Sequence, residues 1–231
     1  ELADERKTLL RKFGTRIYRP QRPGPSWVRV TALGSYREVG RAMHLVTTNE
    51  SKVLVDCGAK PTNNRSEVQP FFAAPEMLPL DNIDAVVITH AHVDHIGMLP
   101  VLFRYGYKGP VYCTQPTRDL MTLLQMDYIK VAQAEGNEAP YSKSDIQECI
   151  KHVVDVNWGE KTDIAPDIKM TMENAGHILG SSSVYMQIGE GRSEHKLLFS
   201  GDIKYEKSWL FDAATVRFNK VDTLVIESTY G

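Results

Sequence analysis

Four side chains that can bind a metal ion fall within six residues: His90, His92, Asp94 and His95. Imidazole nitrogens and carboxylate oxygens are common zinc ligands, and catalytic zinc sites leave one position for water. His90 and His92 can point the same way from an extended segment, whereas Asp94 and His95 begin the next turn and point elsewhere. The segment therefore predicts a short loop that serves two metal ions. A polar helix cap with solvated histidines is the alternative, and this density of ligands disfavours it.

Three more candidate ligands follow apolar runs elsewhere in the chain. Asp56 ends the run Val-Leu-Val, His177 lies between glycines in Gly-His-Ile-Leu-Gly, and Asp202 follows Phe-Ser-Gly. Each is weak evidence alone, because an Asp beside a Gly at the end of a strand is more often a turn residue. Their joint presence around the histidine cluster indicates a composite metal site.

The elements that must position these residues are read from the hydrophobic pattern. Short β-branched runs bounded by turns predict strands, and a continuous apolar run such as Ala85–Thr89 is typical of a strand buried on both faces. Apolar residues at helical spacing predict helices. The predicted strands are 27–33, 42–47, 52–56, 85–89, 153–156, 168–174, 183–188, 196–200 and 223–226, and the predicted helices are 96–105, 116–135 and 144–151, the last capped by Ser142 or Ser144. Two packed sheets under outer helices are the arrangement that this order favours.

The N-terminal segment differs from the rest of the chain. The pattern predicts a helix over about residues 1–13 and a Pro- and Gly-rich linker over 18–26. Residues 1–24 hold seven basic and three acidic side chains, a local charge of +4, so with a net charge of -2 the remainder carries -6. Such a basic segment can contact phosphates or simply form a solvated helix face. We expect either the end of an upstream domain or an arm on this one.

The global composition sets further limits. The chain has 231 residues with 42% hydrophobic and 24% charged, which suits one large domain. No run approaches the ~18 apolar residues of a membrane span, and the N-terminus has no apolar signal core. Three widely spaced cysteines argue against a disulfide framework and for a reducing compartment, so we expect a cytoplasmic protein without a membrane partner. Cys57, beside Asp56, is read as a small buried residue rather than a nucleophile.

In order along the chain, Asp56, the motif His90-X-His92-X-Asp94-His95, His177 and Asp202 resemble the first four motifs of the metallo-β-lactamase fold. The closing segment Glu227-Ser-Thr-Tyr-Gly231 is similar to the first motif of its β-CASP branch, which processes nucleic acids. The segments Gly34–Gly40 and 175–181 look closer still to the archaeal cleavage and polyadenylation specificity factor nucleases. The resemblance covers about residues 27–231.

The resemblance implies a fold, a domain division and a zinc ligand set. The fold is α/β, a four-layer αββα sandwich incomplete at its C-terminus. Residues 27–231 are the metallo-β-lactamase domain, and 1–26 resemble, more weakly, the end of a KH domain. His90, His92 and His177 would hold one zinc ion, and Asp94 and His95 the second, with Asp202 bridging both.

The resemblance also assigns supporting roles. Asp56 would orient a ligand histidine or the catalytic water, and Glu227 would orient groups supplied by a β-CASP domain that follows. In the family, two later histidines follow, one completing the second zinc site and one near the leaving group, and His44, His152 and His195 lie in the wrong order and context to replace them. We therefore expect the second zinc site to be incomplete in this chain, and nuclease activity of the chain alone to be weak or absent. Full-length family members dimerise, so a homodimer is expected there.

Three functions remain open from the sequence. The first is a zinc-dependent ribonuclease, an endonuclease with an optional 5′-3′ exonuclease activity, that cuts RNA or single-stranded DNA in RNA 3′-end processing or transcription termination. The second is a hydrolase of a small thioester or lactam. The Glu227–Gly231 motif disfavours it, because family members that act on small substrates lack the β-CASP domain that this motif introduces. The third is a non-catalytic scaffold subunit, disfavoured because every ligand encoded here is intact. Arg37 could face a phosphate, although a solvated hairpin arginine is the commoner case.

Overall fold

The first of two sheets contains the strands that lead to the histidine cluster. The computed structural model describes residues 2–21, 27–62 and 67–229. Strands β1, β2 and β3 are antiparallel, and β3, β4, β5 and β6 are parallel neighbours. Their bounds are Val28–Gly34, Met43–Thr48, Lys52–Val55, Ala85–Val87, Val111–Cys113 and Val153–Asp155. All of β4 is buried, as its continuous apolar run predicts.

The second sheet supplies the other side of the site. Its strands are ordered β11-β10-β9-β8-β7, and only β10 and β11 are parallel. Their bounds, from β7 to β11, are Lys161–Ala165, Ile168–Asn174, Ser182–Ile188, His195–Phe199 and Thr223–Val225. The two sheets pack face to face through apolar side chains that include Val55, Met172 and Phe199.

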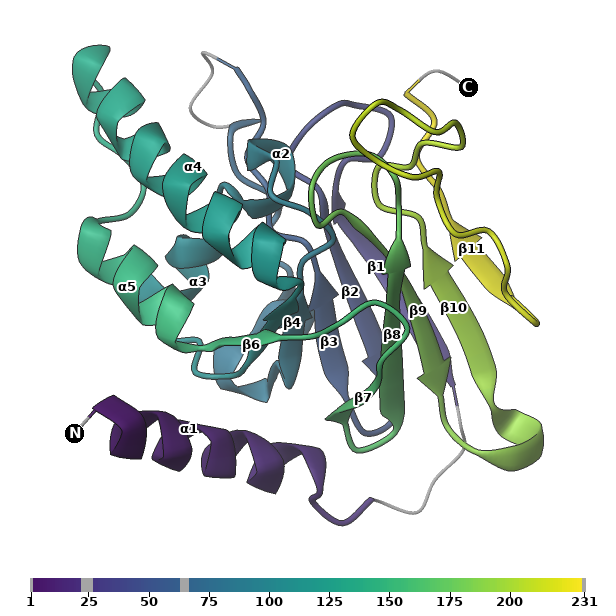
Figure 1. Ribbon diagram of the computed structural model, residues 1–231. Coiled ribbons are helices and arrows are strands. Elements are labelled where there is room, and N and C mark those ends of the chain that lie inside the picture. Colours follow the sequence, from purple (N-terminus) through teal and green to yellow (C-terminus); the bar gives the residue numbers. More distant parts are fainter. Residues whose placement is uncertain (1, 22–26, 63–66, 230–231) are drawn as a thin grey trace.

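Helices cover the other face of the first sheet (Figure 1). They are α2 (Val93–Ile96), α3 (Leu99–Arg104), α4 (Gln115–Ala134) and α5 (Lys143–Lys151), with 3-10 turns η2 (Pro75–Met77), η3 (Leu80–Asn82) and η4 (Gly191–Ser193). A second hydrophobic core lies between these helices and the sheet. The expected α/β fold with two packed sheets is confirmed. Within the described residues the covering helices lie on the first sheet alone.

Several element boundaries differ from the sequence prediction. The helix expected at 96–105 is two helices, α2 and α3, because Gly97 ends the first and Pro100 begins a new turn. Strand β7 was not predicted, since its sequence Lys-Thr-Asp-Ile-Ala has no clear alternation. Ser142 is the cap of α5: its hydroxyl accepts from the Asp145 amide, and the Asp145 carboxylate accepts in return.

Helix α1 (Leu2–Ile17) extends beyond the predicted 1–13 and lies across the end of the sheets (Figure 1). Two of its arginines, and Arg19 just after it, reach main-chain carbonyls of the body: Arg6 donates to Lys151 and Val153, Arg16 to Asp81 and Ile83, and Arg19 to Glu50. Arg19 also pairs with the Asp84 carboxylate at 2.5 Å, and Phe13 is buried against the His152 ring.

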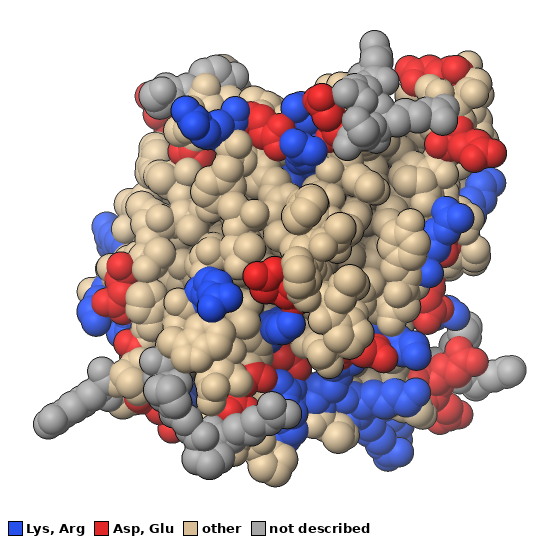
Figure 2. Space-filling view, turned by 180° about the vertical axis from the view of Figure 1, so that it is seen from behind, with Lys and Arg blue, Asp and Glu red and all other residues tan. Residues whose placement is uncertain are grey.

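These contacts account for part of the basic charge of the N-terminal segment. Figure 2 shows basic side chains gathered along the lower edge of the molecule, where Figure 1 places α1. Residues 22–26, in the predicted linker, lie outside the described residues, and the domain boundary at residue 26 stays a prediction. None of the described helices combines the length and apolarity that a bilayer crossing requires. All three cysteines are buried free thiols.

Candidate metal centre

The predicted site residues converge at one end of the two sheets. Asp56 directly follows β3, His90 and His92 follow β4, His177 lies between β8 and β9, and Asp202 follows β10. The carboxyl ends of the parallel strands β3 and β4 meet at the same edge, which brings Asp56 to the histidine loop. His177 and Asp202 come from the second sheet, which packs face to face on the first. Helix α1 lies at the opposite end of the sheets (Figure 1).

Three imidazoles and one carboxylate form the first half of the centre. Nδ1 of His92 lies 3.1 Å from Nε2 of His90 and 3.1 Å from Nε2 of His177. Oδ2 of Asp202 lies 3.7 Å from His90 Nε2 and 3.5 Å from His177 Nε2. One donor atom from each of these four residues lies within 4.8 Å of the others.

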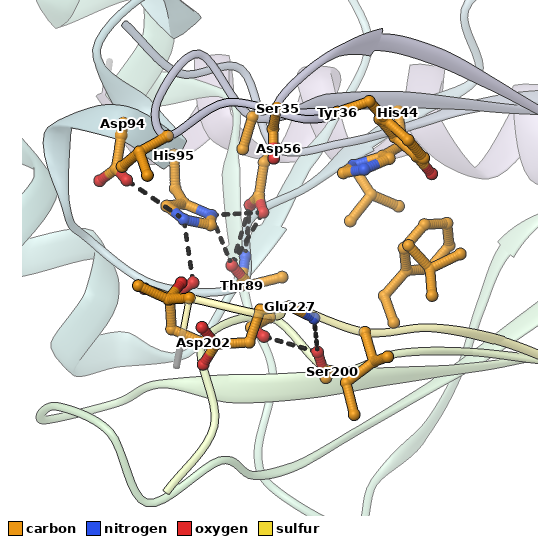
Figure 3. Close-up of a pocket in the computed structure, with 18 of the residues that line it drawn as sticks. Ser35, Tyr36, His44, Asp56, Thr89, Asp94, His95, Ser200, Asp202 and Glu227 are labelled. Carbon is orange, nitrogen blue, oxygen red and sulfur yellow. Dashed lines mark hydrogen bonds and ion pairs between the residues drawn. The ribbon is translucent and has the colours of Figure 1, made fainter. Parts of the chain in front are cut away.

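His95 lies in the second half of the centre, beside Asp94 and Asp202 (Figure 3). Its Nε2 is 3.3 Å from Asp202 Oδ1 and 3.8 Å from Asp94 Oδ2. Asp202 therefore directs one oxygen at His90 and His177 and the other at His95. This is the geometry that a bridging carboxylate requires, although the ligand roles themselves stay a prediction.

Asp56 is buried and holds two neighbours of the cluster in place. Its carboxylate accepts from the Thr89 amide at 2.8 Å, from the Thr89 hydroxyl at 2.9 Å and from His95 Nδ1 at 2.8 Å (Figure 3). The bond to Nδ1 leaves Nε2 of His95 free to face Asp94 and Asp202. A carboxylate that fixes the tautomer and angle of a ligand histidine is common at metal sites. Thr89 was missed from the sequence, and its place directly before His90 was the available signal.

The electrostatics of the cluster favour neutral imidazoles on one side and positive charge on the other. Burial, with the neighbouring imidazoles, lowers the pKa of His90, and burial lowers the pKa of His177. Burial also acts to lower the pKa of His95, but the Asp56 and Asp202 carboxylates outweigh it and raise that pKa to about 10. Neutral imidazole is the form that binds a metal ion, and the carboxylates stabilise a cation beside His95.

The donor set fits a metal ion. Ligand nitrogens around a tetrahedral zinc ion at about 2.0–2.1 Å are about 3.3 Å apart, close to the two 3.1 Å nitrogen separations at His92. The buried imidazole of His90 and the half-buried imidazoles of His92 and His177 converge with the Asp202 carboxylate, as the ligands of one shared cation would. The cluster is compatible with a metal site.

The His177 loop is fixed by two threonines of helix α4. The hydroxyls of Thr114 and Thr117 donate to the Gly180 carbonyl at 2.8 and 3.0 Å. A Cβ at Gly180 would lie 2.7 Å from the Thr114 hydroxyl, and the residue has φ +79°, so glycine is required here. The Ser181 hydroxyl accepts from the amides of His177 and Ile178. The two threonine contacts run to a main-chain carbonyl, which explains why the sequence did not reveal them.

Glu227 lies beside Asp202 and fixes the turn that carries it (Figure 3). Its Oε1 accepts from the Ile203 amide at 2.9 Å, and its own amide donates to the Ser200 hydroxyl at 3.2 Å. Glu227 is thus tied to both sides of Asp202 along the chain. Tyr230 and Gly231, which complete the motif that begins at Glu227, lie outside the described residues.

A cavity of about 560 Å³ opens beside the cluster, with Asp56, Asp94, His95, Asp202 and Glu227 in its wall. The turn between β1 and β2 forms another part of the wall, from Ser35 to Gly40. The space lies within the range of small-ligand sites.

An ion triad braces the turn between β1 and β2. Glu38 accepts from Arg41 Nε at 2.6 Å and from Lys60 Nζ at 2.9 Å, and Lys60 also reaches Glu67 at 3.4 Å. Arg41 donates in addition to the carbonyls of Glu67 and Gln69. The turn is therefore fixed to the loop that follows β3.

Replacing Glu38 with glutamine is expected to change how the free energy of unfolding depends on pH below pH 7. The hydrogen bond from Arg41, with help from Lys60, lowers the pKa of Glu38 from its ordinary 4.5 to about 2. A carboxyl whose pKa is lower in the folded state stabilises the fold above the unfolded value and loses that contribution as the pH falls through the folded value. The variant should therefore be less stable than the parent at pH 7, by about 1 kcal/mol, and equal to it near pH 2.

Urea unfolding at a series of pH values measures this difference. Glu138→Gln, at an exposed position in the loop between α4 and α5, serves as the matched control and should leave the pH dependence of the unfolding free energy unchanged. A Glu38→Gln deficit that is the same size at pH 7 and pH 2.5 would contradict the ion-triad explanation.

The sequence matches the metallo-beta-lactamase superfamily domain over residues 45–227. This range is most of the chain and contains every predicted metal ligand, so the protein belongs to the metallo-β-lactamase superfamily. A solved protein of unknown function from Enterococcus faecalis superposes on 78% of this chain and 44% of its own, with a TM-score of 0.53 at 15% identity. That likeness supports the fold alone.

Much more similar relatives carry the name transcription termination factor FttA. The protein of Methanosarcina mazei is 51% identical over 227 residues, and that of Methanococcus maripaludis is 52% identical over 226 residues. The matches cover 98% and 97% of this chain but 35% of each relative. The chain therefore spans about a third of the length of these relatives. The resemblance to archaeal members of this fold, expected from the motifs, is confirmed.

Proposed function

We propose that this chain carries the metal centre of a zinc-dependent ribonuclease that acts in RNA 3′-end processing or transcription termination. The observation that carries the proposal is the Asp202 carboxylate, with one oxygen toward His90 and His177 and the other toward His95. That arrangement suits two ions side by side. The name of relatives about 50% identical supports RNA as the substrate.

In this proposal His90, His92, His177 and Asp202 hold the first zinc ion. Asp94 and His95 hold the second together with Asp202, so the second ion has fewer ligands from this chain and is bound more weakly. When bound, zinc acts as a Lewis acid and lowers the pKa of a coordinated water.

Side chains that are not proposed ligands position the ones that are. Asp56 fixes the His95 ring through Nδ1, and Thr89 completes the hydrogen bonds of that carboxylate. Glu227 holds the turn on which Asp202 lies. The Cys57 thiol is fully buried, and burial raises its pKa well above the ordinary value. A cysteine nucleophile is therefore not part of the proposal.

The test is cleavage of a labelled single-stranded RNA by the purified full-length protein, analysed on a sequencing gel, because we expect this chain alone to cut RNA weakly or not at all. We expect cleavage that stops with a zinc chelator, returns with added zinc and is absent in His90→Ala. Internal products indicate an endonuclease, and mononucleotides released from the 5′ end indicate an exonuclease. A zinc-loaded protein that hydrolyses a chromogenic lactam but leaves RNA intact would overturn the proposal in favour of a small-substrate hydrolase. Zinc loading without any hydrolysis would favour the scaffold function.

A further inference from the structure

The cavity beside the metal cluster has an aromatic end that the proposed chemistry does not use. Tyr36, His44 and Phe199 lie along it, with ring centroids 5.5 Å apart for Tyr36 and His44 and 5.3 Å apart for His44 and Phe199. Figure 3 shows Tyr36 and His44 on the side of the cavity away from Asp94 and His95. One cavity therefore joins an ionic end to an aromatic end.

The aromatic end is uncharged and partly open. Tyr36 is 51% exposed, although its ring packs against the buried His44 ring. His44 is 9% exposed, its Nδ1 has no hydrogen-bond partner within the described residues, and burial lowers its pKa, so the ring is neutral at pH 7. Tyr36 thus presents an aromatic ring to solvent on an apolar support.

Arg37, next to Tyr36, is the single Lys or Arg among the described residues that line the cavity. The wall otherwise carries the carboxylates of Asp56, Asp94, Asp202 and Glu227, and Glu38, which is paired with Arg41 and Lys60. Arg37 is exposed, and the described part of the chain offers it no ion pair. An unpaired guanidinium at the mouth of an acidic metal site is suited to an anionic group of a ligand.

The turn that carries both side chains is held in a strained conformation. Ser35, Arg37 and Arg41 have φ values of 70°, 61° and 46°, in the left-handed region that non-glycine residues rarely adopt. The ion triad of Glu38, Arg41 and Lys60 braces the turn. Strain of this kind persists where surrounding contacts impose it, and it is concentrated at ligand sites.

We propose that Tyr36 and Arg37 form a subsite for one nucleotide of single-stranded RNA beside the metal centre, with the Tyr36 ring stacked on the base and the Arg37 guanidinium on a phosphate. The proposal rests on the proposed function and adds the residues that position the strand. Stacking on tyrosine tolerates any base, because every base has a π-face. The His44 ring, which itself contacts Phe199, packs against the Tyr36 ring and supports it. Because stacking accepts any base, the subsite is not sequence-specific.

Binding is measured by fluorescence anisotropy with a labelled eight-residue oligouridylate, in the presence of a zinc chelator so that no strand is cut. Tyr36→Ala should raise Kd about tenfold, within the range of one base–aromatic stack, and Tyr36→Trp should restore binding. Arg37→Ala should raise Kd and reduce the slope of log Kd against log salt by about 0.7, the loss of one phosphate contact on a single strand. Tyr105→Ala and Arg11→Ala, exposed residues outside the cavity, are the matched controls.

A scan of single abasic positions along the oligomer gives a readout that a general loss of structure does not. At one position of the oligomer, removal of the base should raise the Kd of the parent protein by the same factor as Tyr36→Ala does. For the Tyr36→Ala variant, removal of that same base should cause no further rise in Kd. Variants that bind within twofold of the parent overturn the subsite, even where the parent cleaves RNA. Tyr36-dependent binding without any RNA cleavage by the full-length protein would support the subsite and overturn the proposed nuclease.

Discussion

Replacing His90 with alanine should lower the affinity for zinc by more than about a hundredfold, the largest effect that we expect from any single change. His90 is fully buried, and its Nε2 faces both His92 and Asp202. Loss of a residue that only supports a ligand already costs about 10–100-fold in metal affinity, so loss of a direct ligand should cost more. RNA cleavage should disappear with the metal.

Elemental analysis of the purified protein, followed by competition with a chromogenic chelator, measures this effect. His195→Ala is a matched control, because His195 lies on β10 at the end opposite Phe199 and bonds to Thr223. We expect one to two zinc ions per chain in the parent and the control. A His90→Ala protein that retains the parent zinc content would show that the ion lies elsewhere.

Replacing Asp56 with alanine should destabilise the metal-free fold by about 3–5 kcal/mol, the cost of removing one partner from a buried charged pair. Asp56 is 2% exposed and has φ 61°, and its carboxylate accepts from the Thr89 amide, the Thr89 hydroxyl and His95 Nδ1. Without it those donors remain buried and unpaired. For a chain of this size the melting temperature should fall by about 10 °C.

Asp56→Asn separates the structural effect from the effect on the site. The amide keeps the volume and one acceptor oxygen, so it should recover much of the stability, but it does not stabilise positive charge at His95. We therefore expect Asp56→Asn to melt close to the parent and to lose zinc from the weaker site first. Asp127→Ala on α4 is the control for a general loss of an acidic residue. Equal melting temperatures for Asp56→Ala and the parent, after chelation, would contradict this explanation.

Much of the site could be predicted because its residues follow strands whose apolar runs are easy to read. His90 and His92 follow β4, and Asp56 ends a similar run in β3, so the parallel pairing of these two strands brings the three residues together. Asp202 ends an apolar run in the second sheet and reaches them because the two sheets pack face to face. The ligand roles of these residues, and of His177, stay predictions until metal is measured.

The contacts that sequence reasoning missed use main-chain partners or distant charges. Thr114 and Thr117 donate hydrogen bonds to the Gly180 carbonyl. Because every residue has a main-chain carbonyl, the sequence does not indicate which one accepts such a bond. The triad of Glu38, Arg41 and Lys60 forms only when two loops pack together. Strand β7 was missed because polar residues on a sheet edge show no clear alternation, and the helix at 96–105 divides where Gly97 ends the first turn.

The way in which α1 is attached bears on how this fold can vary between species. Arg6, Arg16 and Arg19 donate hydrogen bonds to the main-chain carbonyl oxygens of five residues of the body. Every amino acid supplies that oxygen, so substitutions at the receiving positions leave these acceptors in place. The attachment therefore depends on three arginines and Phe13 on the N-terminal side, while on the body the described side-chain partners of these four residues are Asp84 and His152.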